Sequence, residues 1–224
     1  MKYEKINTMS SYAPWLSDKL FLNTFNKVKK ESLVDLYRCY GLWDIIHNLK
    51  DTKGDLIEVG VWKGASSIII AQALKKLKSK SKFYMCDTFC GVVKSSNKDT
   101  IYKNGEHSDT SLELVQNKID KFNFKNIKVL KGIFPEETSK FIKSKTIKFI
   151  HIDVDVYNSA KDIVNWVWPK LVKNGIIVFD DYGSRRCSGI TKYVNKLKKE
   201  KDKFVFYNLN GQAIVIKNKL KKDF

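Results

Sequence analysis

The sequence predicts an α/β protein: a doubly wound, mostly parallel sheet of seven strands that ends in an antiparallel hairpin. Two observations support the parallel part. From residue 55 onward, short apolar runs alternate with segments of helical periodicity. The runs are rich in β-branched residues and do not alternate apolar with polar side chains, which is typical of strands buried on both faces. The third observation is Asn210-Gly211 between the last two strand-like runs, which predicts the hairpin.

The predicted elements alternate strand and helix in the manner of a Rossmann-like fold. Two helices, 18–29 and 32–50, precede the sheet, so residues 1–50 are predicted to form a helical cap on a domain of residues 51–224. The parallel strands are predicted at 56–60, 82–87, 127–132, 147–154 and 175–180, and the helices between and after them at 65–78, 111–122, 135–143, 159–172 and 190–199.

The final hairpin is expected to join strands 203–209 and 212–217. A two-residue type I′ turn is predicted there, because Asn210 and Gly211 both tolerate positive φ. A hairpin appended to a parallel sheet is not the usual layout of dinucleotide-dependent dehydrogenases. It resembles the layout of class I S-adenosylmethionine methyltransferases.

Length and composition suit one compact domain. The chain has 224 residues, and none of its apolar stretches is long enough to span a bilayer. The first ten residues lack the apolar core of a signal peptide, so a cytoplasmic location is expected. The four cysteines form neither a C-x-x-C pair nor a zinc-ligand spacing, which is typical of free thiols in a reducing compartment: Cys39, Cys86, Cys90 and Cys187.

A formal net charge of +18 raises the question of an anionic partner. The lysines are spread over nearly every predicted helix and loop, and only Arg38, Arg185 and Arg186 are arginines. This dispersion favours a generally solvated surface. An anionic small substrate such as a nucleotide sugar is the next interpretation, and RNA is the third.

Three aspartates mark the predicted functional edge of the sheet. Asp153 ends one buried run, and Asp180 and Asp181 end the next. The crossover between these strands is expected to be right-handed, so all three carboxylates meet at the carboxyl edge, where ligands bind in open α/β sheets. Crowded carboxylates repel one another unless a cation joins them, which favours a hard divalent ion. The alternative is that they only cap turns and helices.

A second ligand end is predicted at the first strand. Glu58, Gly60, Trp62 and Gly64 lie in a strand-to-helix segment of the form G-x-x-x-G, which lets the backbone approach a ligand closely. This is not the G-x-G-x-x-G dinucleotide fingerprint, and the bulk of Trp62 would obstruct a pyrophosphate. Asp87 ends the second strand, where a carboxylate can accept two hydrogen bonds from a ribose diol. Glu58 could receive the ammonium of a methionyl group.

The ordered series of these segments resembles the macrocin-type sugar O-methyltransferases, a metal-dependent branch of the class I enzymes. The resemblance covers most of residues 35 to 195. Its segments are Tyr37-Arg38-Cys39-Tyr40-Gly41-Leu42, Glu58-Val59-Gly60-Val61-Trp62-Lys63-Gly64, Asp87-Thr88-Phe89, Asp109-Thr110-Ser111, Lys131-Gly132-Ile133-Phe134-Pro135, Ile150-His151-Ile152-Asp153-Val154-Asp155-Val156-Tyr157 and Gly175-Ile176-Ile177-Val178-Phe179-Asp180-Asp181-Tyr182-Gly183.

The resemblance implies an S-adenosylmethionine- and Mg²⁺-dependent transfer of a methyl group to a sugar hydroxyl, and it implies self-association. It makes Asp153, Asp180 and Asp181 the magnesium ligands and places Asp153 beside the methyl group. Two positions depart from the patterns of related enzymes: Val154 replaces a common glycine, and Val156 excludes the lysine base of catechol-type enzymes. Further cofactor contacts are assigned to Trp62, Ser66, Thr88 and Gly132.

Two residues are candidates for the base that removes the hydroxyl proton. Asp153 is close to the expected methyl group, but a metal-bound carboxylate is a weak base. His107 is the other candidate, because an unperturbed imidazole titrates near neutrality, and it lies in a polar loop of about twenty residues, a length typical of lids that exclude water. A solvent-exposed His107 without a role is the alternative. His151, two residues before Asp153, is expected to be packed and hydrogen-bonded.

Substrate contacts are expected on the loop that follows the aspartate pair. Tyr182, Arg185 and Arg186 lie there, and the planar arginine fork suits the phosphates of a nucleotide-linked sugar. The acceptor could also belong to a surface polysaccharide or a glycosylated metabolite. RNA methylation and a non-catalytic nucleoside-binding module are the alternative functions.

Overall fold

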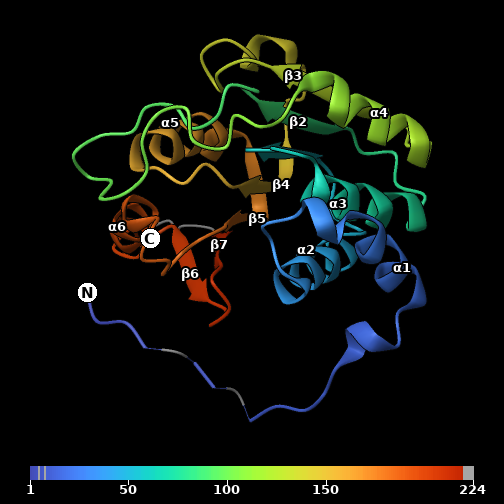
Figure 1. The fold of residues 1–224 in the computed structure, drawn as a ribbon, viewed down its shortest axis with the longest axis horizontal. Coiled ribbons are helices and arrows are strands. Elements are labelled where there is room, and N and C mark those ends of the chain that lie inside the picture. Colours follow the sequence, from blue (N-terminus) through green and yellow to red (C-terminus); the bar gives the residue numbers. More distant parts are fainter. Residues whose placement is uncertain (5, 8, 219–224) are drawn as a thin grey trace, which may run out of the picture.

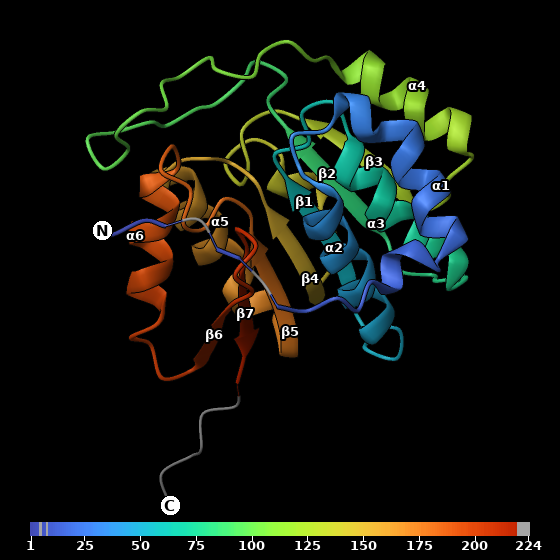
Figure 2. The ribbon, with the colours of Figure 1, turned by 60° about the horizontal axis from the view of Figure 1, so that its bottom comes forward.

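The computed structural model describes residues 1–4, 6–7 and 9–218 and forms one sheet with helices on both faces (Figures 1 and 2). The last six residues of the predicted domain 51–224 lie outside the described part. The sheet has seven strands in the order β3-β2-β1-β4-β5-β7-β6. The strands are β1 (Asp55–Val59), β2 (Phe83–Asp87), β3 (Ile127–Lys131), β4 (Ile147–Ile152), β5 (Leu171–Phe179), β6 (Lys203–Tyr207) and β7 (Ala213–Lys217).

The predicted fold class is confirmed. Strands β1 to β5 pair in parallel, and β7 pairs antiparallel to both β5 and β6. The strand order reverses direction between β1 and β4, so the crevice at their carboxyl ends is the expected ligand position for such a sheet. The sequence therefore folds so that the glycine segment and the first aspartate belong to neighbouring strands.

Helices cover the two faces of the sheet unequally (Figure 2). On one face, α1, α2 and α3 pack together, and their apolar side chains share a core with Phe83, Met85 and Phe149 of the sheet. On the other face, α5 and α6 share a core with Ile150 and Ile177. The helices are α1 (Lys19–Val28), α2 (Leu36–Asn48), α3 (Ala65–Lys76), α4 (Leu112–Phe122), α5 (Tyr157–Val167) and α6 (Ser188–Leu197).

Two predicted helices differ in the structure. The predicted helix 135–143 was wrong: the segment makes turns and a short 3-10 helix, Ser139–Phe141. Only a few of its side chains are buried, so it has no apolar stripe to hold an α-helix against the sheet. The predicted helix 159–172 ends early, because Pro169 lies in a 3-10 turn and Leu171 already pairs with β4.

The hairpin forms as predicted, but its turn does not. Strands β6 and β7 are joined by residues 208–212, and positive φ occurs at Leu209 and Gly211 instead of at Asn210. The side-chain oxygen of Asn208 accepts hydrogen bonds from the backbone N–H groups of Asn210 (2.9 Å) and Gln212 (3.1 Å). This side chain organises a longer loop in place of the two-residue turn.

Within the described residues, no helix combines the length and the apolar character that crossing a membrane requires.

Gly60 brings the first strand and the first aspartate into direct contact. Its φ is +88°, and a Cβ built on it would lie 1.7 Å from the carbonyl oxygen of Asp153. The backbone N–H of Asp153 donates in turn to Val59 at 2.9 Å. A side chain at residue 60 would therefore push the two ends of the crevice apart.

This contact can be isolated by comparing two glycines with nearly equal φ. We expect Gly60→Ala to lower the free energy of unfolding by more than about 4 kcal/mol, because backbone strain and overlap with Asp153 add. Gly105→Ala should cost only about 1–2 kcal/mol, because φ there is +89° but nothing lies within 4 Å of the added Cβ. Urea unfolding measures both, and equal losses would contradict the close approach.

Candidate active site

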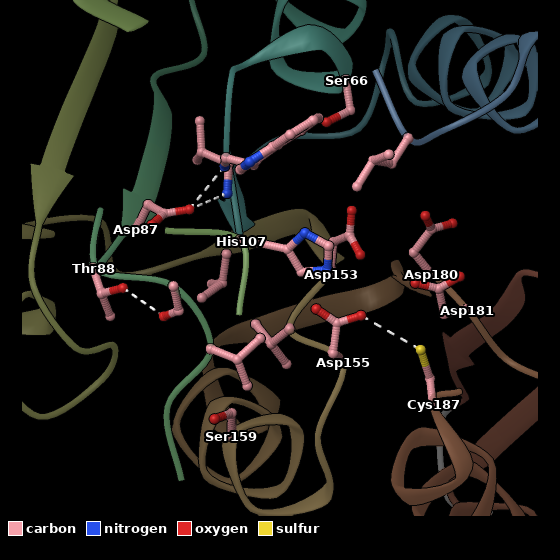
Figure 3. Close-up of a pocket in the computed structure, with 18 of the residues that line it drawn as sticks. Ser66, Asp87, Thr88, His107, Asp153, Asp155, Ser159, Asp180, Asp181 and Cys187 are labelled. Carbon is pink, nitrogen blue, oxygen red and sulfur yellow. Dashed lines mark hydrogen bonds between the residues drawn. The ribbon is translucent and has the colours of Figure 1, made fainter. Parts of the chain in front are cut away.

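A cavity of about 470 Å³ opens at the carboxyl ends of β1, β2, β4 and β5 (Figure 3). Its size lies in the usual range for small-ligand pockets. It joins the glycine segment to the aspartate cluster in one continuous space. Eleven of the predicted site residues line it: Gly60, Trp62, Ser66, Asp87, Thr88, His107, Gly132, Asp153, Asp180, Asp181 and Arg186.

Glu58 does not line this cavity. Its side chain, on β1, is fully buried; one carboxylate oxygen accepts from the Ser67 hydroxyl and the other lies 2.7 Å from Nδ1 of His151. Each oxygen thus already has one partner within the protein, and the contact with a ligand ammonium stays a prediction. Gly64 also lies outside the cavity lining, at the N-cap of α3 with a φ of +84°.

Two of the three predicted substrate residues lie outside the cavity lining as well. The Tyr182 hydroxyl donates to Oδ1 of Asn195 and accepts from Nζ of Lys198, both at 2.7 Å, so this side chain is turned toward α6. The Arg185 guanidinium lies 5.3 Å from the ring centre of Tyr3. Arg186 is the member of the group that lines the cavity.

Asp87 organises the glycine segment. Its Oδ2 accepts from the backbone N–H groups of Val61 (2.6 Å) and Trp62 (2.8 Å), and its Oδ1 accepts from Phe89 (2.6 Å). A carboxylate has about four acceptor sites, so three of them are used within the protein. By that count the side chain keeps about one acceptor position, and the two hydrogen bonds from a ribose diol stay a prediction.

The long loop between β2 and α4 carries His107. The loop is folded on itself, because Val92 donates to Glu106 (2.8 Å) and accepts from Gly105 (2.9 Å) through the backbone. His107 is half-buried, and its Nε2 lies 3.1 Å from the Tyr102 hydroxyl. The predicted candidate base therefore faces the cavity with a hydrogen-bond partner already in place.

The opposite end of the cavity carries four carboxylates, from Asp153, Asp155, Asp180 and Asp181 (Figure 3). Burial, together with the neighbouring carboxylates, raises the pKa of Asp153 well above its usual range and that of Asp155 to about 7. Burial also raises the pKa of Asp180 to about 6, against the lowering effect of the Arg38 guanidinium. Negative charge is thus unfavourable here without further cations.

Arg38 supplies a cation that the sequence prediction had missed. From α2, its Nη1 donates to Asp180 (2.7 Å) and to Asp181 (3.3 Å), and its Nε donates to Asp35 (2.8 Å). Gln212 adds a neutral donor, from Nε2 to Asp180 at 3.0 Å. The sequence marks these two residues only weakly as site residues: Arg38 is the one arginine outside the 185–186 pair, and Gln212 is the residue after the Asn-Gly pair.

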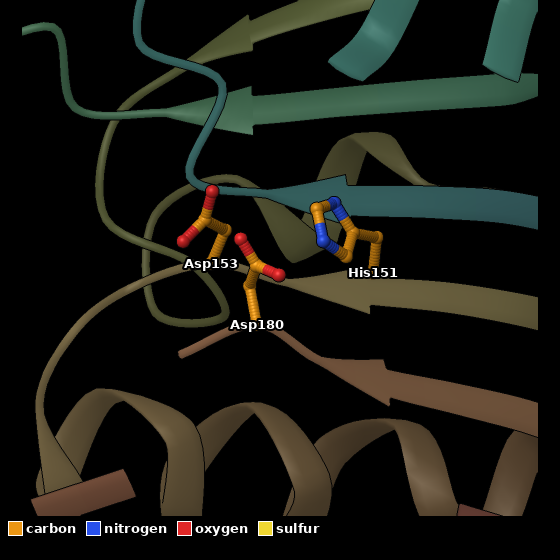
Figure 4. A group of neighbouring side chains, drawn as sticks. All are labelled: His151, Asp153 and Asp180. Carbon is orange, nitrogen blue, oxygen red and sulfur yellow. The ribbon is translucent and has the colours of Figure 1, made fainter. Parts of the chain in front are cut away.

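The acidic end contains two groups of candidate metal ligands whose donor atoms lie within 4.8 Å of one another. One group is His151, Asp153 and Asp180 (Figure 4). The other is Asp155, Asp181 and Cys187, in which the thiol Sγ lies 3.4 Å from Oδ1 of Asp155. The predicted ligands Asp153, Asp180 and Asp181 are thus divided between two adjoining groups.

Solved structures share the fold of this chain. The O-methyltransferase NovP superposes with a TM-score of 0.74 at 18% identity and covers 84% of this chain and 82% of its own. An O-methyltransferase from Bacillus cereus, solved in complex with SAH, gives a TM-score of 0.60 at 16% identity over 90% of this chain and 91% of its own. The fold is that of the class I methyltransferases.

The family follows from the sequence itself. Residues 27–205 match the macrocin-O-methyltransferase (TylF) family, and the chain belongs to it. A curated relative, the 8-demethyl-8-(2,3-dimethoxy-alpha-L-rhamnosyl)-tetracenomycin-C 4'-O-methyltransferase of Streptomyces olivaceus, is 27% identical over 144 residues, which is 60% of this chain and 55% of the relative. The chain spans little more than half the length of the curated relatives that it matches.

The role of Arg38 can be tested through stability. Replacing it in Arg38→Met leaves buried Asp180 without its charged partner, so we expect the free energy of unfolding to fall by about 3–5 kcal/mol in EDTA. Arg186→Met is the matched control, because its ion pair with Glu106 is largely exposed and should contribute little to stability. Urea unfolding of both variants decides, and similar small losses would contradict a charge-compensating role for Arg38.

Proposed function

We propose that this chain is a divalent-cation- and S-adenosylmethionine-dependent O-methyltransferase that methylates a sugar hydroxyl, with Mg²⁺ as the cation. The observation that carries the proposal is the single cavity that connects the Gly60–Asp87 end to the carboxylate cluster. Membership of the macrocin-O-methyltransferase family supports methyl transfer, and the rhamnosyl group in the name of one relative supports a sugar acceptor.

The acidic end fits a divalent cation. Four carboxylates gather there, of which Asp180 and Asp181 pair with Arg38, and a buried ring nitrogen of His151 without a hydrogen-bond partner lies beside them. Asp153, Asp180 and Asp181 would hold the ion through oxygen, the donor that Mg²⁺ prefers. When bound, the cation would supply positive charge that makes a nearby hydroxyl more acidic.

The other end fits a nucleoside cofactor. S-adenosylmethionine would supply the methyl group. Gly60 leaves the backbone bare where it passes Asp153, and Asp87 keeps one acceptor position for a ribose hydroxyl. The protein's own contribution is alignment of the acceptor oxygen with the methyl carbon and sulfur. The lining residues that would contribute are Trp62, Ser66, Thr88 and Gly132. The SAH in the Bacillus cereus structure supports this cofactor class.

The acceptor would enter beside Arg186 and the long loop. The Arg186 guanidinium lies 5.2 Å from the Tyr102 ring centre, and its Nη2 lies 3.2 Å from Glu106. An anionic group on the acceptor, such as the diphosphate of a nucleotide sugar, would compete for this exposed guanidinium. A sugar of a surface polysaccharide or a glycosylated metabolite would fit the same cavity without that contact.

The metal dependence is tested by Asp180→Asn. We expect it to bind S-adenosylmethionine within a few-fold of the native affinity, because Asp180 lies at the opposite end from Asp87, yet to lose methyl transfer by at least about 100-fold. EDTA should cause the same loss of methyl transfer in the native protein, and added Mg²⁺ should restore the transfer. Asp120→Asn, at an exposed carboxylate of α4, is the control.

Calorimetry and transfer of a labelled methyl group to a panel of nucleotide sugars provide the measurements. Undiminished transfer in EDTA would exclude the metal mechanism. Transfer to RNA instead of sugars would favour the alternative acceptor, and failure to bind S-adenosylmethionine would leave only the non-catalytic interpretation.

The base is tested in single-turnover experiments. We expect Asp153→Asn to slow methyl transfer by more than about 100-fold and His107→Ala to slow it by less than about tenfold, because His107 already shares its Nε2 with Tyr102. Tyr102→Phe keeps the ring and removes only that partner, so it should resemble His107→Ala. A 100-fold loss in His107→Ala, with a flattened pH dependence, would instead make His107 the base.

A further inference from the structure

One buried nitrogen in the acidic end has no hydrogen-bond partner. Among the described residues, two buried side-chain polar atoms are unpartnered: Nε2 of His47 and Nε2 of His151. The His151 side chain is fully buried. An unpaired buried polar atom costs roughly 1–3 kcal/mol, so its retention calls for a physical explanation. The two histidines differ in what lies next to the free nitrogen.

Glu58 sets the orientation of the His151 ring. Its Nδ1 lies 2.7 Å from Oε1 of Glu58, and Oε2 of Glu58 accepts from the Ser67 hydroxyl. A carboxylate oxygen accepts this hydrogen bond, so Nδ1 carries a proton, and in the neutral ring Nε2 then presents a lone pair. Glu58 and His151 are both fully buried, which holds the ring in this orientation.

The free lone pair faces the carboxylates. His151 lies in β4, and Asp153 directly follows the end of that strand. Side chains two residues apart along a strand point to the same face of the sheet. Figure 4 shows one ring nitrogen directed toward the carboxylates of Asp153 and Asp180 and the other directed toward β1. The three side chains bring donor atoms within 4.8 Å of one another.

We propose that Nε2 of His151 is a nitrogen ligand of the divalent cation and that Glu58 is the positioning residue that orients it. A metal-binding histidine commonly donates its other N–H to a carboxylate in this way. The inference rests on the proposed function, because it concerns the same cation. It also gives Glu58 a role that its distance from the cavity lining left open.

A nitrogen ligand changes the expected metal preference. Imidazole suits first-row transition metals, whereas Mg²⁺ prefers oxygen. Mn²⁺ accepts both donors, so it should bind this site more tightly than Mg²⁺ does. Glu58→Gln keeps the shape of the side chain but weakens the hold on His151, and we expect it to lower Mn²⁺ affinity by about tenfold.

Pulsed electron paramagnetic resonance on the Mn²⁺-loaded full chain, without S-adenosylmethionine, tests the proposal directly. We expect coupling to a directly bound nitrogen, and we expect that coupling to change when the protein is labelled with ¹⁵N-histidine. The label needs no mutation, so the test stands even if a variant fails to fold. The coupling should be absent in His151→Gln and unchanged in His47→Gln, whose free nitrogen lies away from the cluster.

The outcomes separate this inference from the proposed function. If Mn²⁺ binds and supports methyl transfer but only oxygen ligands are detected, His151 is not a ligand and the function stands. Persistence of the nitrogen coupling in His151→Gln would also overturn the assignment. If no Mn²⁺ binds at all, both this inference and the metal-dependent function fail.

Discussion

The crowding of negative charge at the ends of β4 and β5 constrains the rest of this structure. Asp153, Asp155, Asp180 and Asp181 share one partly buried end of the cavity, and burial penalises the ionised forms of the first three. In the described part of the chain, the Arg38 guanidinium and the neutral donor of Gln212 stabilise the ionised Asp180 by hydrogen bonds. Both partners come from outside the parallel sheet, so α2 and the terminal hairpin complete the acidic end.

The backbone joins this acidic end to the nucleoside end without intervening side chains. Gly60 touches the carbonyl oxygen of Asp153 so closely that only a hydrogen atom fits between them. One strand away, the carboxylate of Asp87 accepts hydrogen bonds from three backbone N–H groups. Two of them belong to Val61 and Trp62, so Asp87 fixes the turn that follows Gly60. A displacement at either end would therefore be transmitted to the other, which is a useful property where two reactants must be aligned to within a fraction of an ångström.

Much of the fold, and the two ends of the cavity, could be predicted from the sequence because they depend on local patterns. Buried parallel strands are apolar throughout, and residues at their carboxyl ends must share an edge. The helix predicted at 135–143 failed because composition alone does not reveal which side chains will be buried. Arg38 and Gln212 were missed for another reason: their contacts with Asp180 join residues far apart in the sequence, and nothing local marks them.

The choice of arginine at position 38, in a chain so rich in lysine, has a geometric reason. Asp35 caps α2 by accepting from the N–H groups of Tyr37 and Arg38, and its second oxygen accepts from Nε of Arg38. The opposite edge of the same guanidinium reaches Asp180 and Asp181. A planar fork with five donors can join a helix start to two strand ends, whereas the single ammonium of lysine has neither the width nor the fixed directions to do so. Docking of the start of α2 and compensation of the acidic cluster therefore depend on the same side chain.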